Sequence, residues 1–202
     1  GFVKVIATDG HRLSLASMSM ETINQSAEAI LPRKTVTELI KLLGDTEEEV
    51  KINLGKNLVT FTFGNINLVS KVIEGKFPDY NKVIPSNYNN HVVLDRLTML
   101  HAMQRASILS NEKFRGVRMV LTQNSMRVIC NNTEQEEAEE ELEIEYVDEP
   151  LDIGFNVTYL LDVLNNINTK EVDCSFGDAN SSCLITVPGD DRFKYVVMPM
   201  RI

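Results

Sequence analysis

The sequence predicts an α+β fold in which antiparallel sheets carry short helices on one face, repeated in two tandem domains. Two matches along the chain support this prediction. Residues 36–43 match residues 157–164, and residues 49–55 match residues 171–177, in the same order and at nearly the same offset of 121 to 122 residues. In both copies the first segment has helical periodicity, and the second begins a run of short strands separated by glycine-containing turns.

The repeated helices are predicted from apolar residues that share one face. Val36, Leu39, Ile40 and Leu43 recur at i, i+3, i+4 and i+7, as do Val157, Leu160, Leu161 and Leu164. This spacing indicates short amphipathic helices that pack one stripe on a sheet, and Asn156 can cap the second of them. Asp95 can cap a further helix that runs to about Leu109, with one face formed by Met99, Ala102, Met103 and Ala106.

Strands are predicted at residues 91–94, 116–121 and 125–131, and residues 4–6 parallel residues 127–129. The second copy has about forty residues before Arg127, whereas the first has only three before Lys4. We therefore place the two domains at residues 1–86 and 87–202, and expect the opening strands and helix of the first to lie upstream of this sequence.

The net charge of −9 comes from one segment. Residues 134–149 contain ten acids and no Lys or Arg, so the rest of the chain is close to neutral. Apolar and acidic residues alternate in the second half of this segment, which predicts an exposed strand with Leu142 and Ile144 on one face and Glu141 and Glu143 on the other. This acidic strip is either a solvated edge that repels other strands or a docking face for a basic partner.

Composition excludes several classes of protein. At 202 residues, with 43% of them apolar, the chain can bury a sizeable core. No apolar run approaches the roughly 20 residues of a membrane-spanning helix. The three cysteines, Cys130, Cys174 and Cys183, lack the spacing of a metal site and indicate small core residues in a reducing compartment, the cytoplasm. The alternative for the last two is a disulfide across a hairpin.

The last eight residues, Tyr-Val-Val-Met-Pro-Met-Arg-Ile, are unusually apolar for a chain terminus. A final β-strand accounts for residues 195–198. It does not account for Pro199 and Met200, because proline cannot donate to a β-ladder and methionine recurs at surfaces that accept many peptides. We therefore interpret residues 198–202, the C-terminal tail, as one wall of an apolar peptide groove.

Four segments together closely resemble the bacterial β sliding clamp family, the processivity subunit of the replicative DNA polymerase. They are Ala-Thr-Asp-Gly-His-Arg-Leu at 7–13, Phe-Pro-Asp-Tyr at 77–80, Leu-Ser-Asn-Glu-Lys-Phe-Arg-Gly-Val-Arg at 109–118 and Met-Pro-Met-Arg at 198–201. The resemblance implies tandem DNA-clamp domains, most of the second domain and the whole third domain of a three-domain subunit. It also implies that two complete subunits close into a ring around duplex DNA.

The resemblance further implies a groove between the second and third domains that accepts Gln-Leu-x-Leu-Phe-like peptides of the polymerase, the clamp loader and repair and translesion polymerases. Its implied residues are Thr8, Gly10, His11, Arg12, Leu13, Pro78, Lys82, Val83, Asn156, Tyr159, Asn180, Ser182, Val196, Val197, Met198, Pro199, Met200 and Arg201. Lys82 stands where an arginine is usual in the family, and Asn180 where an apolar residue is usual.

Two further sets of residues follow from the family pattern. Sequence-independent contacts to DNA phosphates are expected from Arg33 and Lys34, just before the first repeated helix, and from Arg96 and Arg105. The ring interface is expected to use Ile108, Leu109, Phe114, Glu134, Glu136, Glu137, Glu139 and Glu140. Without the first domain, we expect this chain to be a monomer.

Two other functions remain as alternatives. A small hydrolase would use Asp9, His11 and a carboxylate of the acidic strip, which would have to converge in one pocket. A purely structural repeat protein would bind no peptide. We expect neither catalytic residues nor a metal or other cofactor, because His11, His91 and His101 have no ligand cluster around them and no nucleophile motif is present.

Overall fold

The structure is a computed structural model that describes residues 1–21, 26–44, 47–88 and 90–202. The chain folds into two compact units. Unit 1 comprises Gly1 and Glu21–Asp79, and unit 2 comprises Phe2–Met20 and Tyr80–Ile202. None of the helices in the described ranges is long and apolar enough to cross a membrane.

Unit 1 is a helix on a small antiparallel sheet. Helix α1 (Arg33–Leu43) is followed by strands in the order β3-β4-β5, which are β3 (Lys51–Leu54), β4 (Leu58–Phe63) and β5 (Ile66–Lys71). Alternate residues of β4 point to the helix side, so that Val59, Phe61 and Phe63 are buried with Leu39 and Leu43 packed against them. The core of this unit is therefore small.

The predicted stripe of α1 is only partly buried. Leu39 and Leu43 pack on the sheet, but Val36 is exposed and Ile40 is 69% exposed. The described sheet of unit 1 has three strands, too few to cover the whole stripe. The helix also begins earlier than predicted, so Arg33 and Lys34 form its first turn and do not precede it.

Unit 2 contains two antiparallel sheets and two helices. The first sheet has the order β1-β2-β13-β12-β11-β6 and the second β10-β7-β8-β9. The strands are β1 (Phe2–Thr8), β2 (Arg12–Ser19), β6 (Asn90–Asp95), β7 (Gly116–Thr122), β8 (Ser125–Asn131), β9 (Glu137–Glu143), β10 (Leu151–Asn156), β11 (Glu171–Phe176), β12 (Cys183–Val187) and β13 (Asp190–Val197). The helices are α2 (Arg96–Ser107) and α3 (Val157–Asn166), and a short 3-10 helix spans Tyr80–Lys82.

One core joins both sheets and both helices of unit 2. Helix α2 contributes Met99, Ala102, Met103 and Ala106, the face predicted from sequence. Both predicted caps are confirmed, because the side chain of Asp95 accepts a hydrogen bond from the Thr98 amide at 2.8 Å and that of Asn156 accepts one from the Thr158 amide at 2.9 Å. Each cap satisfies an amide that a helix start leaves unpaired.

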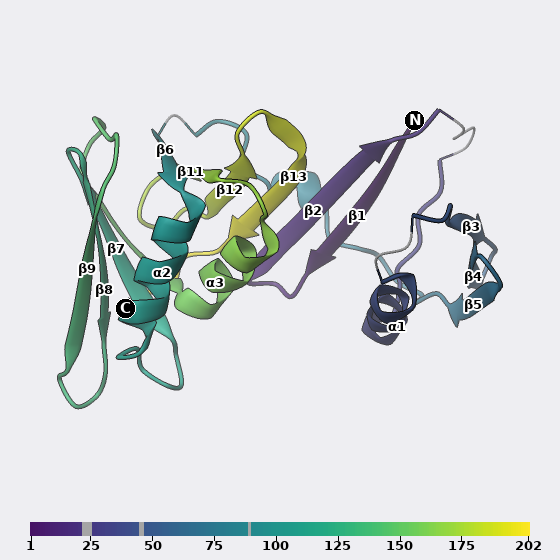
Figure 1. The fold of residues 1–202 in the computed structure, drawn as a ribbon, viewed down its shortest axis with the longest axis horizontal. Coiled ribbons are helices and arrows are strands. Elements are labelled where there is room, and N and C mark those ends of the chain that lie inside the picture. The colour runs from purple at the N-terminus through teal and green to yellow at the C-terminus, as the bar shows by residue number, and fades with distance from the viewer. Residues whose placement is uncertain (22–25, 45–46, 89) are drawn as a thin grey trace. The chain divides into compact units, whose positions relative to one another are not determined.

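The first hairpin of the chain pairs with its last strand. In the six-stranded sheet, Leu13 of β2 lies opposite Val196 of β13, and Arg12 lies opposite Val197. In Figure 1 the purple strands β1 and β2 accordingly lie beside the yellow strand β13. This pairing brings the β1–β2 turn next to the start of the C-terminal tail.

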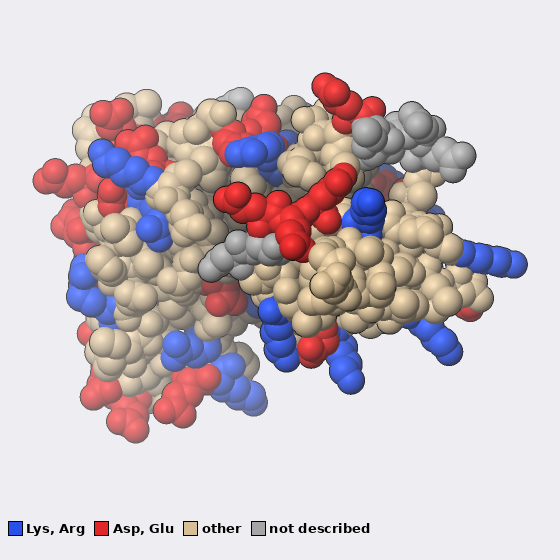
Figure 2. All heavy atoms as spheres, turned by 45° about the vertical axis from the view of Figure 1, so that its right-hand side comes forward, with Lys and Arg blue, Asp and Glu red and all other residues tan. Residues whose placement is uncertain are grey.

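The acidic strip contains an edge strand, which lies earlier than predicted: β9 covers Glu137–Glu143, and Ile144 and the acidic residues after it follow the strand. Strand β9 ends the four-stranded sheet, with Glu141 and Glu143 exposed and Leu142 buried. Glu140 lies on the same side as Leu142, where it pairs with a basic side chain of α2. On the face drawn in Figure 2, acidic and basic side chains are interspersed.

All three cysteines are buried free thiols, so the alternative of a Cys174–Cys183 disulfide is wrong. Burial raises the pKa of Cys130 to about 11 and that of Cys183 well above its usual value. The thiols of Cys130 and Cys183 are therefore neutral at physiological pH, as buried core residues should be.

Candidate functional site

The turn between β1 and β2 is held by its own side chains. Asp9 Oδ1 accepts hydrogen bonds from the backbone amides of His11 at 3.0 Å and Arg12 at 3.1 Å, and Gly10 takes a φ of 87°. A positive φ is readily adopted only by glycine. Burial alone would raise the pKa of Asp9, but the hydrogen bonds from these amides and from the Arg12 guanidinium outweigh it and leave the pKa below its usual value.

Arg12 connects this turn to helix α3. Its Nε lies 3.1 Å from Asp9 Oδ2, its Nη1 lies 2.5 Å from Asp162 Oδ2, and its guanidinium carbon lies 4.3 Å from the centre of the Tyr159 ring. The His11 ring stacks on the same tyrosine with centroids 6.3 Å apart. Polar and aromatic groups from the β1–β2 turn, β2 and α3 thus form a cluster on the surface of unit 2.

The C-terminal tail leaves the sheet after Val197 and crosses two elements. The amide of Met198 donates to the carbonyl of His11 at 2.9 Å, and the amide of Met200 donates to the carbonyl of Gly154 at 2.8 Å. A Cβ atom on Gly154 would lie 2.5 Å from the Met200 oxygen and 2.7 Å from Ile202. The tail therefore lies directly on the backbone of β10, at a position that tolerates no side chain.

The apolar residues predicted for the groove differ in their exposure. Leu13, Val196 and Val197 are buried, and the first two pack with Tyr80, Ile84 and Leu184 in a small core. The apolar surface open to solvent comes from Val83, 39% exposed, and Met198, 46% exposed, with Pro199 and Met200 half-buried. The buried residues Leu13, Val196 and Val197 therefore belong to the core and contribute little surface that a ligand could contact.

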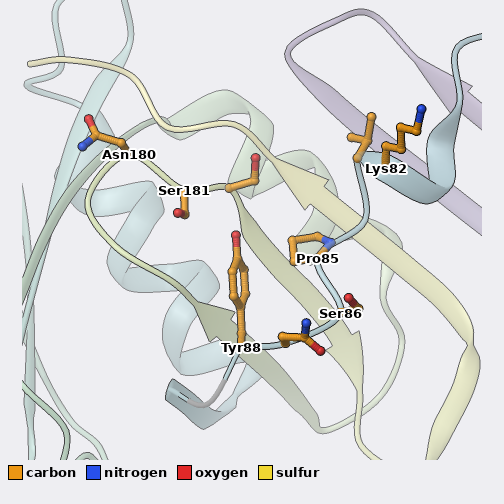
Figure 3. Close-up of a pocket in the computed structure, with 9 residues that line it drawn as sticks. Lys82, Pro85, Ser86, Tyr88, Asn180 and Ser181 are labelled. Carbon is orange, nitrogen blue, oxygen red and sulfur yellow. The ribbon is translucent and has the colours of Figure 1, made fainter.

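The polar residues predicted for the groove lie at several places. Thr8 donates to the carbonyl of Arg12 at 2.8 Å, and Asn156 caps α3. Lys82, Val83, Asn180 and Ser182 line a hollow of about 430 Å³ (Figure 3). Arg201 lines a second hollow of about 530 Å³ beside Met200 and Ile202. Pro78 belongs to unit 1.

The residues predicted for DNA contact fall into two groups. Arg33 and Lys34 are exposed on the first turn of α1. Arg96, in contrast, donates to the carbonyls of Thr169 and Leu164 at 3.0 Å each, which satisfies the C-terminal end of α3. Arg105 forms two hydrogen bonds of 2.7 Å to Glu140. Arg96 and Arg105 therefore have structural partners that the sequence did not reveal.

The residues predicted for the ring interface lie near the end of α2 and along β9. Ile108 is 77% exposed, Phe114 is exposed and Leu109 is half-buried. Glu134, Glu136, Glu137 and Glu139 are exposed, whereas Glu140 is half-buried because it faces α2. The hydrogen bonds from Arg105 hold the pKa of Glu140 below its usual value.

Three site residues have no clear signal in the sequence. Asp162 anchors Arg12, Gly154 leaves room for Ile202 of the tail, and Gly116 lies beside the same isoleucine. Their roles depend on partners far along the chain, which no periodicity reveals. Within the described ranges, no three His, Cys, Asp or Glu side chains gather in a way that could hold a metal ion.

The chain matches two models of one protein family. The model of the DNA polymerase III beta subunit, C-terminal domain, matches residues 81–201, and that of the central domain matches residues 2–79. The beta sliding clamps of Pseudomonas putida and Escherichia coli K12 are 45% and 40% identical over 201 and 200 residues, in each case 99% of this chain. The chain covers 55% of each of these relatives, about half their length.

Solved structures agree with these matches. The crystal structure of a DNA polymerase sliding clamp from Pseudomonas aeruginosa with ligand superimposes with a TM-score of 0.97 at 45% identity, covering all of this chain and 56% of that one. A sliding clamp of the same organism bound to griselimycin gives a TM-score of 0.96, and the Caulobacter crescentus protein gives 0.94 at 38% identity.

Proposed function

Because the chain belongs to the DNA polymerase III beta subunit family, we propose that it acts as the central and C-terminal domains of a sliding clamp. In this role it is an accessory, non-catalytic subunit that tethers the replicative polymerase to duplex DNA in the cytoplasm. It docks the polymerase, the clamp loader and repair and translesion polymerases through a groove beside the C-terminal tail.

The pairing of β2 with β13 is the observation that carries the docking proposal. It sets the turn at His11 and Arg12 beside Met198, with the two segments joined by the hydrogen bond from the Met198 amide. Polar anchors and exposed apolar side chains thereby share one surface, which is how short peptides are held in a preformed groove. A relative that binds griselimycin also supports a ligand site in this family.

In this geometry Asp9 is not available as the catalytic base that the hydrolase alternative requires. Both oxygens of Asp9 are occupied by the turn and by Arg12, and its lowered pKa makes it a poor base. The glutamates of β9 with odd numbers point to solvent.

A calorimetric titration with a Gln-Leu-x-Leu-Phe peptide tests the docking proposal. We expect saturable binding near a micromolar dissociation constant, roughly −8 kcal/mol, because a short peptide buries few atoms. A control peptide with alanine in place of the second leucine and the phenylalanine should bind at least tenfold more weakly. Equal affinity for both peptides would contradict a groove that recognises the leucine and the phenylalanine. No binding of either peptide would leave the structural repeat protein.

DNA binding by this chain is expected to be weak, independent of sequence and sensitive to salt. We propose that Arg33 and Lys34 each contact a phosphate loosely, since a clamp that slides must not prefer one site. Replacing both with alanine should lower the salt slope of binding to duplex DNA by about two, measured by fluorescence anisotropy between 50 and 150 mM salt. Tight binding to one sequence would contradict this role.

Ring closure is proposed for the complete subunit. Ile108, Leu109 and Phe114 would supply an apolar contact beside the glutamates of β9, and the partner surface would belong to a domain outside this chain. The chain alone is then a monomer in dilute solution, which light scattering can establish.

A further inference from the structure

Asp162 is a residue outside the predicted groove that holds one of the groove residues. It lies on the exposed face of α3, one turn after Tyr159 and 150 residues along the chain from Arg12. Its Oδ2 accepts a hydrogen bond from Arg12 Nη1 at 2.5 Å. The bond therefore joins α3 to the start of β2, next to the turn that carries His11.

Helix α3 gives Asp162 a fixed base. Val157, Leu160 and Leu164 of the helix are fully buried in the core of unit 2. The end of the helix is held by Arg96, whose Nη1 donates to the carbonyl of Leu164 at 3.0 Å. A helix packed in this way has few alternative positions, so a side chain bonded to Asp162 is fixed relative to the core.

Arg12 has three contacts, and Asp162 holds its outer end. Asp9 Oδ2 lies 3.1 Å from Arg12 Nε, close to the stem of the side chain, and belongs to the same turn. The guanidinium carbon lies 4.3 Å from the centre of the Tyr159 ring. Because the guanidinium is planar, bonds at both Nε and Nη1 fix its plane over that ring.

The exposure of the pair indicates that its main effect is not on folding. The side chain of Asp162 is 52% exposed and that of Arg12 is 33% exposed. Ion pairs at such exposure add little to stability, because water and salt screen them and both side chains must be ordered. That ordering matters for binding, since an arginine that is already held need not be immobilised when a ligand arrives.

We propose that Asp162 is a positioning residue for peptide docking, which acts through Arg12 and does not itself touch the peptide. This role rests on the proposed docking function and adds to it a residue from outside the groove. The guanidinium of Arg12 and the ring of Tyr159 then form one wall before a peptide arrives, and less ordering free energy is lost on binding.

Calorimetry with the Gln-Leu-x-Leu-Phe peptide and the Asp162→Ala variant tests this role. We expect binding about three- to tenfold weaker, the range for one side chain that must be ordered on binding. The melting temperature should fall by less than about 3 °C, because the pair is exposed. Asp162→Glu restores a carboxylate and should bring the affinity within about twofold of the original. Asp191→Ala removes an exposed carboxylate from the start of β13 and should leave the affinity unchanged.

Two further measurements separate positioning from direct contact. In an Arg12→Ala background, Asp162→Ala should cause no further loss of affinity, because its effect passes through Arg12. Nitrogen-detected NMR of the peptide-free chain should show separate Nη1 and Nη2 signals for Arg12, since the bond to Asp162 restricts rotation of the guanidinium. These two signals should merge in Asp162→Ala and stay separate in Asp162→Glu.

Two outcomes overturn the positioning role while the docking function stands. Unchanged affinity of Asp162→Ala for the peptide would show that the pair is a surface contact without influence on binding. A loss that persisted in the Arg12→Ala background would show that Asp162 meets the peptide directly. Failure of the unsubstituted chain to bind the peptide would instead remove the docking function, and the role of Asp162 with it.

Discussion

Removal of residues 198–202 is expected to weaken binding of the Gln-Leu-x-Leu-Phe peptide at least tenfold while the fold persists. Met198 and Met200 supply exposed or half-buried apolar surface beside the groove. The loss of one or two central contacts at ~1–2 kcal/mol each accounts for the effect. None of the five residues belongs to a core cluster, so the free energy of unfolding should fall by less than about 1 kcal/mol.

Calorimetry with the deletion variant and circular dichroism of its thermal unfolding measure the two quantities separately. Met200→Ala is the single-residue version and should weaken binding in the same direction. A deletion variant that unfolded at a much lower temperature would show that the tail closes the sheet. Unchanged affinity in a folded variant would mean that the groove lies elsewhere.

Gly154→Ala offers an independent route to the same result, because it leaves every residue of the tail in place. The new methyl group would collide with the Met200 carbonyl and with Ile202, so the tail must move. We expect weaker peptide binding from this displacement alone. Gly189→Ala is a matched control: Gly189 has open space around it and lies in the turn before β13, although its positive φ adds a local strain.

Phe155→Ala is expected to have the largest effect on stability, a loss of about 3–5 kcal/mol in the free energy of unfolding. Phe155 is fully buried in the core of unit 2, between the two site residues Gly154 and Asn156. The cost combines lost burial with the cavity that remains, because the surrounding sheets and helices cannot close around it.

Urea unfolding followed by circular dichroism measures this loss, since the chain has no tryptophan to report by fluorescence. Val147→Ala is the control, because Val147 is exposed and its replacement should change stability by less than about 0.5 kcal/mol. A loss below about 1 kcal/mol for Phe155→Ala would mean that β10 is not part of a tightly packed core.

Local signals in the sequence predicted most elements of unit 2. The caps at Asp95 and Asn156, the buried face of α2 and the alternation in β9 all depend on residues within one or two turns or strand repeats of each other. Such short-range patterns predict the folded structure well, because each describes hydrogen bonds or apolar contacts made within one element. The last strand ends at Val197, one residue short of the predicted end at Met198 and two residues before the proline that cannot extend it.

Long-range contacts could not be predicted in the same way. The pairing of β2 with β13, the bond from Arg12 to Asp162 and the pair of Arg105 with Glu140 join residues that no periodic pattern relates. For Arg96 and Arg105, surface charge suggested phosphate contacts, whereas the fold supplies carbonyl and carboxylate partners. The exposed Ile40 shows the same limit, because a stripe in the sequence does not reveal how much sheet is present to cover it.

Methyl NMR of the methionines tests the central claim most directly, because six of the eight methionines lie either in the tail or in the core. Met198 and Met200 lie in the tail, while Met99, Met103, Met119 and Met126 are buried in the core of unit 2. Addition of the Gln-Leu-x-Leu-Phe peptide should shift the methyl signals of Met198 and Met200 in a saturable manner and leave the four core signals in place. Saturable binding that left both tail signals unmoved would contradict a groove walled by the C-terminal tail.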